Sequence, residues 1–186
     1  LFEDRNSVDG LSGYGLNFLA GVLKNAPSMT ALTNPTVNSY KRINAPVTKS
    51  GATWSPNTVT WTGNNRTHMV RIPDNGRFEL RLADGAVNPY LLQAAVVAAG
   101  LDGVKNKLLP SKKLDINMYE EGHKLKSVKK LPLNLLDALR LLKSSKVMRA
   151  YLGNEMIDGF CKLKEKEWDD YSTFLSDWER KATLDI

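Results

Sequence analysis

The residues best suited to chemistry are charged side chains in the middle of the chain. In the stretch RFELR at 77–81 the residues alternate, so Arg77, Glu79 and Arg81 share one face of a predicted strand. Five arginines fall within forty residues, at positions 42, 66, 71, 77 and 81. The arginine fork matches phosphate and carboxylate oxygens, which favours a polyanionic ligand such as a nucleoside triphosphate. Glu79 suits one oxygen ligand of Mg²⁺ or Mn²⁺.

The same alternation has a simpler explanation. An Arg-Glu-Arg row on an antiparallel strand is more often a solvent-facing ladder of cross-strand ion pairs, and the pattern alone favours that interpretation. His68 and His123 have no partner at metal-ligand spacing, so both are predicted to be structural. Cys161 lies in the apolar phase of a helix and is predicted to be part of the core. The sequence contains no Gly-rich phosphate loop, nucleophile elbow or zinc spacing.

Composition limits the class of protein. With 186 residues, 42% hydrophobic and 25% charged, the chain is predicted to be one globular domain or a large piece of one. One cysteine excludes an internal disulfide framework and fits a reducing compartment. The net charge of +6 is spread out, and the basic run at 123–131 lacks aromatics, so neither a nucleic acid nor a membrane is predicted as a partner. Because the first residue is leucine, we expect a fragment or a processed chain.

The first half of the chain is predicted to place the charged residues on short strands and their connecting loops. A helix is expected over 11–25, capped by Ser12 and closed by Pro27. The segment 34–55 is rich in Asn, Pro, Thr, Ser and Gly and is predicted to be a long irregular loop. Three strands follow, of which the last two form a hairpin, at 58–62, 67–72 and 77–82.

The second half is predicted to be mainly helical. Asn88 and Pro89 begin a helix that is apolar on nearly every side and should be buried. The segment 105–130 is predicted to be mostly loop. From Leu133 helices return, with Asn134 as N-cap, and end in an amphipathic stretch over 156–178. The fold class is therefore α+β, with antiparallel strands packed against helices.

Several longer motifs occur in a fixed order. They are NPTVNSYKR at 34–42, NNRTHMVRIP at 64–73, RFELR at 77–81 and DGAVNPYLLQAAVVAAGLDGVKNK at 84–107. Together they resemble the C-terminal part of the catalytic domain of glutamine synthetase, over essentially the whole chain. The resemblance implies the α+β fold of that domain over 1–186, with a helical C-terminal segment at 131–186. It also implies that the N-terminal domain and the first part of the catalytic domain are absent.

The resemblance implies a carbon–nitrogen ligase. That family forms glutamine from glutamate, ammonia and ATP through γ-glutamyl phosphate, with Mg²⁺ or Mn²⁺. Positioning and charge neutralisation lower the barrier in such phosphoryl transfers. The expected setting is cytoplasmic nitrogen metabolism, in a homo-oligomer of two hexameric rings.

The resemblance also implies a role for each arginine. Arg42 matches the catalytic arginine that approaches the substrate carboxylate and the transferring phosphate. Arg66 and Arg71 match arginines that hold the ATP phosphates and the developing charge, so Arg66 counts as catalytic as well. Arg77 matches an arginine that contacts the nucleotide. Arg81 matches the arginine that grips the α-carboxylate of glutamate.

One absence and one departure from the family pattern matter. Glu79 matches one metal-binding glutamate, but the family's other metal ligands lie before Leu1, so we expect this polypeptide alone to be inactive. The family's common pattern also has a glutamate after YKR that deprotonates ammonium, whereas no glutamate lies between Arg42 and Arg77 here. This places the chain nearer the type III-like branch, which includes γ-glutamylmethylamide synthetases. A γ-glutamyl-amine ligase and a non-enzymatic anion-binding or assembly module therefore remain alternatives, and neither the amine nor the regulation is indicated.

Overall fold

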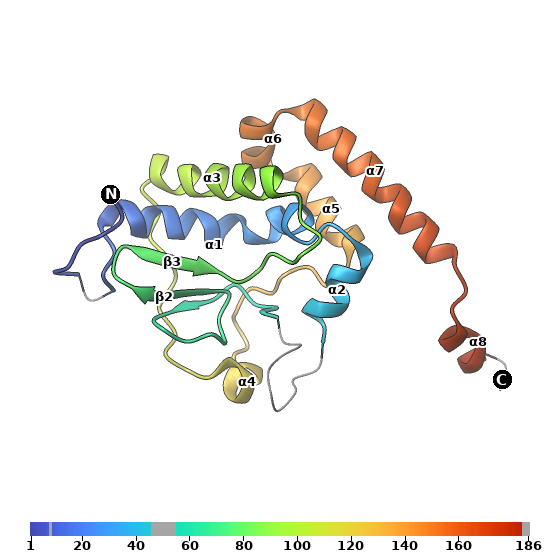
Figure 1. Ribbon diagram of the computed structural model, residues 1–186, viewed down its shortest axis with the longest axis horizontal. Coiled ribbons are helices and arrows are strands. Elements are labelled where there is room, and N and C mark those ends of the chain that lie inside the picture. The colour runs from blue at the N-terminus through green and yellow to red at the C-terminus, as the bar shows by residue number, and fades with distance from the viewer. Residues whose placement is uncertain (8, 46–54, 184–186) are drawn as a thin grey trace.

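A computed structural model describes residues 1–7, 9–45 and 55–183 of the chain. Its elements, in order, are α1 (Gly13–Thr33), α2 (Val37–Ile43), β1 (Trp61–Thr62), β2 (Val70–Asp74), β3 (Arg77–Leu80), α3 (Pro89–Lys105), α4 (Met118–Glu121), η1 (Gly122–Lys124), α5 (Leu135–Ser144), α6 (Lys146–Leu152), α7 (Asn154–Thr173) and α8 (Asp177–Thr183). Helices α1 and α3 cover one face of a small sheet, and α4 lies on the other side (Figure 1). Helix α7 packs along α5 and reaches α2, and α8 lies beyond its far end (Figure 1).

The three strands form a sheet in the order β1-β2-β3. Strands β2 and β3 form the predicted antiparallel hairpin, and β1 pairs with β2 in parallel. Arg71 lies opposite Glu79, but the register then shifts so that Asp74 lies opposite Arg77. The extra residue is on β2, where Pro73 has no N–H to donate, as is common at a bulge. Strand β2 begins later than predicted because residues 64–68 form a loop instead.

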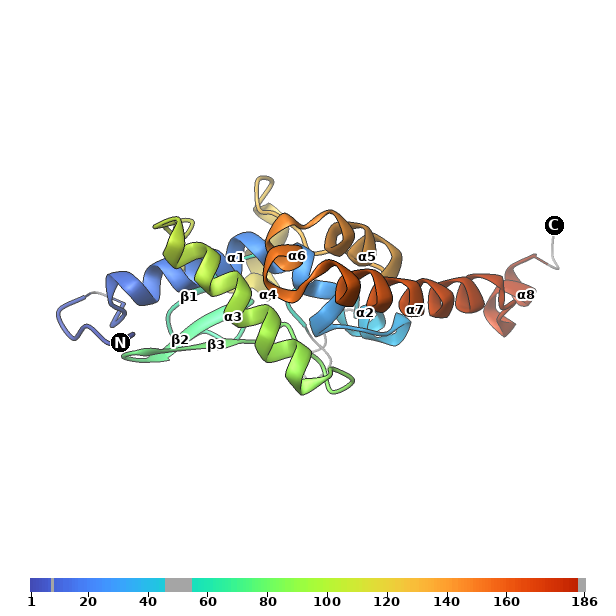
Figure 2. The same cartoon turned by 90° about the horizontal axis from the view of Figure 1, so that it is seen from above.

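Helices α1 and α3 pack closely through glycines. A Cβ on Gly103 would lie 2.0 Å from the carbonyl oxygen of Asn17, and one on Gly21 would lie 2.1 Å from that of Ala99. No side chain fits at such distances, so this contact requires glycine on both helices. Seen from above, α3 runs obliquely across α1 and the sheet (Figure 2).

Helix α1 contradicts the predicted end at Asn25. Ser12 caps its start as predicted, accepting from the Gly15 N–H at 3.1 Å, but the helix continues through Pro27 to Thr33. An internal proline costs a helix about 3 kcal/mol. Burial of the following turns outweighs that cost, because Met29 and Leu32 are both fully buried.

The predicted loop over 34–55 was also wrong in part. Residues Val37–Ile43 form α2, which begins with a reciprocal capping box between Thr36 and Ser39. Tyr40 and Ile43 then pack into the core. Residues 46–54 of the predicted loop lie outside the described residues.

For the remaining helices, the predicted first residues agree with the structure better than the predicted buried residues do. Asn88 and Asn134 cap α3 and α5 as expected. Helix α3, however, is buried mainly where it faces α1, and its Val97 is 49% exposed. In α7 Cys161 is buried as predicted, whereas Leu163 is 68% exposed. No helix in the described part of the chain is long and apolar enough to cross a membrane.

Candidate functional site

Glu79 is the centre of a cluster of charged side chains on the sheet face opposite to α1 and α3. Its Oε2 accepts a hydrogen bond from Nη2 of Arg71 at 2.8 Å, and its Oε1 lies 3.5 Å from Nε of Arg81. The side chain of Arg71 is only 12% exposed, whereas that of Glu79 is 41% exposed. The cross-strand ion pair expected of a ladder is therefore present, but its arginine is largely buried rather than facing solvent.

Backbone pairing brings these side chains together. Arg71 and Glu79 are direct partners in the β2–β3 register. The second terminal nitrogen of Arg71, Nη1, donates to Oδ1 of Asn64 at 2.6 Å, which fixes the orientation of the guanidinium. The Arg81 N–H donates to the Met69 carbonyl at 2.8 Å, so the end of β3 is held beside the loop that precedes β2.

The cluster carries an excess of positive charge. The hydrogen bond from Arg71 holds the pKa of Glu79 below its usual value, and the charges of Arg81 and Arg66 add to this effect. Arg66 itself is exposed on the loop before β2. Burial lowers the pKa of Arg81, and the nearby Tyr119 and Glu79 oppose that change. Three guanidinium groups around one carboxylate form a surface suited to an anion.

The other two predicted arginines lie differently. Arg42, on α2, donates from Nη1 to the Leu82 carbonyl at 3.3 Å, so it reaches the end of β3 next to Arg81 in the chain. Arg77 pairs instead with Asp74 at the hairpin end, where both side chains are more than 60% exposed. The row predicted for RFELR is thus divided, because the bulge at Pro73 brings Asp74 opposite Arg77.

The described residues do not by themselves complete a metal site. Both carboxylate oxygens of Glu79 face arginine nitrogens, and no group of three His, Cys, Asp or Glu in the described ranges could hold a metal ion. Mg²⁺ and Mn²⁺ require about six ligands, mostly oxygen. Glu79 is suited to contribute one of them.

Two residues of the cluster were missed at the level of sequence. Asn64 orients Arg71, and Tyr119, on α4, lies in the electrostatic field of Arg81. Asn64 lies just before the strand predicted at 67–72, and Tyr119 fell in a segment predicted to be loop. The one local signal near Tyr119 is Asn117, the N-cap of α4, which could have indicated that a helix begins there.

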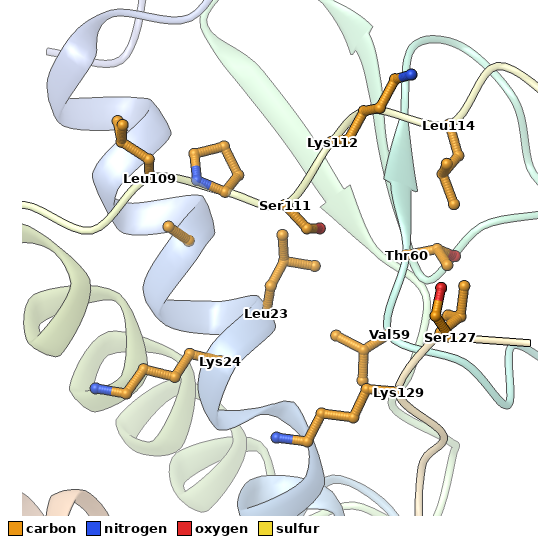
Figure 3. A pocket seen from close by; sticks show the side chains of 13 residues that line it. Leu23, Lys24, Val59, Thr60, Leu109, Ser111, Lys112, Leu114, Ser127 and Lys129 are labelled. Atoms are coloured by element: carbon orange, nitrogen blue, oxygen red, sulfur yellow. The ribbon is translucent and has the colours of Figure 1, made fainter.

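A cavity of about 430 Å³ lies elsewhere in the molecule, between α1 and the segments 109–114 and 127–129 (Figure 3). Apolar side chains such as Leu23, Val59 and Leu114 line it, with Lys24 and Lys129 among its polar residues. None of the six predicted site residues lines this cavity. The arginine cluster and this cavity are therefore separate sites on the molecule.

The α+β fold has counterparts among known proteins. Residues 1–183 match the family model described as "Glutamine synthetase, catalytic domain". The chain belongs to the glutamine synthetase family.

Several members of this family are similar over the whole chain. Glutamine synthetase of Rhizobium leguminosarum bv. phaseoli is 59% identical over 185 residues, covering 100% of this chain and 42% of that protein. Glutamate–methylamine ligase of Methyloversatilis universalis is 44% identical over 191 residues, covering 100% of this chain and 43% of that protein. The chain thus spans less than half the length of these curated relatives.

Two solved structures have the same fold. One, described as a GmaS/ADP complex in conformation 1, is 56% identical with a TM-score of 0.93, covering 100% of this chain and 43% of its own. The other, described as apo GmaS without ligand, is 52% identical with a TM-score of 0.90, covering 100% of this chain and 41% of its own. The α+β fold predicted from the sequence, that of a glutamine synthetase catalytic domain, is confirmed.

Proposed function

We propose that this chain is the C-terminal part of the catalytic domain of an ATP-dependent ligase that forms glutamine from glutamate and ammonia. The observation that carries the proposal is the convergence of Arg71 and Arg81 on Glu79 within a member of the glutamine synthetase family. An arginine-rich face of this kind is suited to the phosphates of ATP and the carboxylate of glutamate at once.

Each residue of the cluster has a separate proposed task. Arg66 and Arg71 bind the ATP phosphates and neutralise the charge that develops as the γ-phosphoryl group moves to the γ-carboxylate of glutamate. Arg81 binds the α-carboxylate of glutamate, and Arg42, beside the end of β3, stabilises the transferring phosphate. Removing one such donor costs about a hundredfold in rate in comparable sites.

Two further tasks rest on single residues. Arg77 is proposed to contact the nucleotide from the exposed end of the hairpin. Glu79 is proposed to give one oxygen ligand to Mg²⁺ or Mn²⁺, which when bound neutralises phosphate charge; no step is assigned to the metal, because the described residues supply only this part of its site. The ADP named in the related GmaS structure supports nucleotide binding by the protein to which this chain belongs.

A second candidate is a γ-glutamyl-amine ligase that uses methylamine. Two observations favour it: the similarity to glutamate–methylamine ligase and GmaS, and the absence of a glutamate between Arg42 and Arg77. The intact enzyme is proposed to be a cytoplasmic homo-oligomer. The non-enzymatic alternative, an anion-binding module, would bind ATP without consuming it.

The test is amine-dependent phosphate release by a protein in which this chain is joined to the rest of the catalytic domain. With ATP and glutamate present, ammonia and methylamine are compared as limiting substrates. We expect turnover with ammonia at least equal to that with methylamine; the reverse order would favour the second candidate. The Arg81→Gln substitution should lower kcat/KM for glutamate about a hundredfold. The matched control, Arg140→Gln, removes a 66% exposed arginine on α5 and should change little.

The isolated chain provides a second arm of the same experiment. It is expected to release no phosphate, because Glu79 alone does not complete a metal site among the described residues. Clear turnover by the isolated chain would contradict this. Phosphate release that required neither glutamate nor an amine would overturn the ligase proposal itself.

A further inference from the structure

The segment that precedes α4 is bound by side chains of the loop between β1 and β2. Oγ1 of Thr62 donates to Oδ1 of Asp115 at 2.8 Å, and the Met118 N–H donates to Oγ1 of Thr67 at 3.0 Å. Two further side chains, His68 and Asn65, bind the Ile116 carbonyl at 2.9 and 3.0 Å. Four side-chain hydrogen bonds therefore join 62–68 to 115–118, although the two segments are about fifty residues apart in the sequence.

His68 is the buried member of this set. Its side chain has no exposed surface, and its Nδ1 has no hydrogen-bond partner among the described residues. Since the Ile116 carbonyl only accepts, Nε2 carries the proton. Burying an imidazole with one unsatisfied nitrogen is unfavourable, whereas leucine of similar volume would bury without that penalty. The hydrogen bond to Ile116 is what the imidazole adds at this position.

The same loop also holds Arg81. Residue Met69, directly after His68, accepts the Arg81 N–H at 2.8 Å. On the other side, Asn117 accepts from the Tyr119 N–H at 3.0 Å and thereby starts α4. Tyr119 opposes the lowering of the pKa of Arg81 that burial causes. The loop is therefore a common anchor for Arg81 and Tyr119.

We propose that His68 is a positioning residue that holds Tyr119 beside Arg81, and that Tyr119 takes part in binding the carboxylate that Arg81 grips. The inference rests on the proposed function, because it takes that carboxylate to be the α-carboxylate of glutamate. His68 acts through the Ile116 carbonyl and does not touch the substrate. Tyr119 carries a phenol, a hydrogen-bond donor for a carboxylate oxygen, on α4, whose start is held against the loop before β2.

Three substitutions in the longer protein test this arrangement by their effect on KM. His68→Leu removes the donor and should raise KM for glutamate about tenfold, the value of one hydrogen bond. KM for ATP should stay within about twofold, because Arg71 is held by Asn64 and Glu79 and not by His68. His68→Gln keeps an N–H near the position of Nε2 and should restore KM for glutamate to within about threefold of the wild type.

Tyr119→Phe tests the same contact from its other end. It removes only the hydroxyl of a half-buried side chain and should raise KM for glutamate about three- to tenfold. The double substitution should be no worse than His68→Leu alone, because both act on one contact. Additive effects, or equal increases in KM for glutamate and ATP, would show a merely structural role and overturn the proposal. If circular dichroism shows that His68→Leu does not fold, Tyr119→Phe alone decides: an unchanged KM for glutamate would refute the proposal.

Arg81→Gln separates this inference from the proposed function. If Arg81→Gln leaves the glutamate dependence unchanged, the proposed function is wrong and the inference is overturned with it. If Arg81→Gln raises KM for glutamate while His68→Leu and Tyr119→Phe do not, only the inference is wrong. A rise with all three, with rescue by His68→Gln, supports both.

Discussion

Two carboxylates, Asp102 and Glu79, show how differently this chain builds its scaffold and its site. Asp102, on α3, is 7% exposed and accepts hydrogen bonds from Lys24, Asn25 and Asn106. Glu79, on β3, has a side chain that is 41% exposed and lies among arginines whose charge it only partly offsets. Asp102 is satisfied entirely within the chain.

The comparison shows that the buried groups between α1 and α3 find their partners within the chain, whereas the charge of the arginine cluster is only partly offset. Between α1 and α3, glycines allow the two backbones to pack closely. The buried carboxylate of Asp102 accepts hydrogen bonds from one lysine and two amide side chains. The arginine face retains positive charge that no described carboxylate neutralises, which is the property of a binding surface. Stability should therefore depend on the first region and ligand binding on the second.

The largest expected loss of stability comes from the glycine contact. Gly103→Ala places a Cβ 2.0 Å from the Asn17 carbonyl oxygen, so α1 and α3 must separate. We expect the free energy of unfolding to fall by about 3 kcal/mol or more, measured by urea denaturation. The control is Gly159→Ala in α7, where nothing lies within 4 Å; it should stabilise by about 0.5–1 kcal/mol. An unchanged free energy of unfolding for Gly103→Ala would show that α1 and α3 can move apart without loss of stability.

The next effect concerns the buried carboxylate. Asp102→Ala leaves the buried Asn25 amide with only the Gly21 carbonyl as a partner and should lower the free energy of unfolding by about 2–3 kcal/mol. Burial raises the pKa of Asp102, but the hydrogen bonds from Lys24 and Asn25 outweigh it, so the net shift is downward. A lowered pKa gives stability that is complete above the ordinary value of 3.8 and is lost as pH falls through the folded-state value. The difference between wild type and Asp102→Ala should therefore narrow in acid; a constant difference would contradict the assignment.

The smallest effect on stability is expected at Glu79. Because its side chain is 41% exposed, Glu79→Gln should change the free energy of unfolding by less than about 1 kcal/mol. In the longer protein the same substitution should lower ligase activity about a hundredfold, since it removes the proposed metal ligand. Denaturation of the isolated chain and phosphate release by the longer protein measure the two effects separately. A large loss of stability with activity retained would show that Glu79 is a structural residue, like Asp102, and does not take part in ligand binding.

Local signals in the sequence predicted much of the fold. Ser12, Asn88 and Asn134 were identified as helix caps because the hydrogen bonds of a cap join residues two or three apart. The β2–β3 hairpin followed from its turn for the same reason. Helix α1 was predicted to end too early, because Pro27 is a strong local signal for a helix end. The burial of Met29, which favours continuing the helix, depends on residues far away in the sequence.

The candidate site was predictable in its residue types and less so in its geometry. The motifs correctly indicated the glutamine synthetase family, and they placed arginines and one glutamate on short strands. They did not indicate Tyr119, because the hydrogen bonds that hold the start of α4 beside the loop before β2 join segments about fifty residues apart. The roles of the six charged residues stay predictions.

The sequence by itself therefore determined the family, the α+β class and the supply of guanidinium groups, since each follows from residue types and their order. Only the tertiary structure decided which of them meet. The bulge at Pro73 shifts the register by one residue, so Arg71 faces Glu79 while Arg77 faces Asp74. Strand register and long-range hydrogen bonds are set by the packing of the whole chain, so side chains that share one face of a strand can have different cross-strand partners.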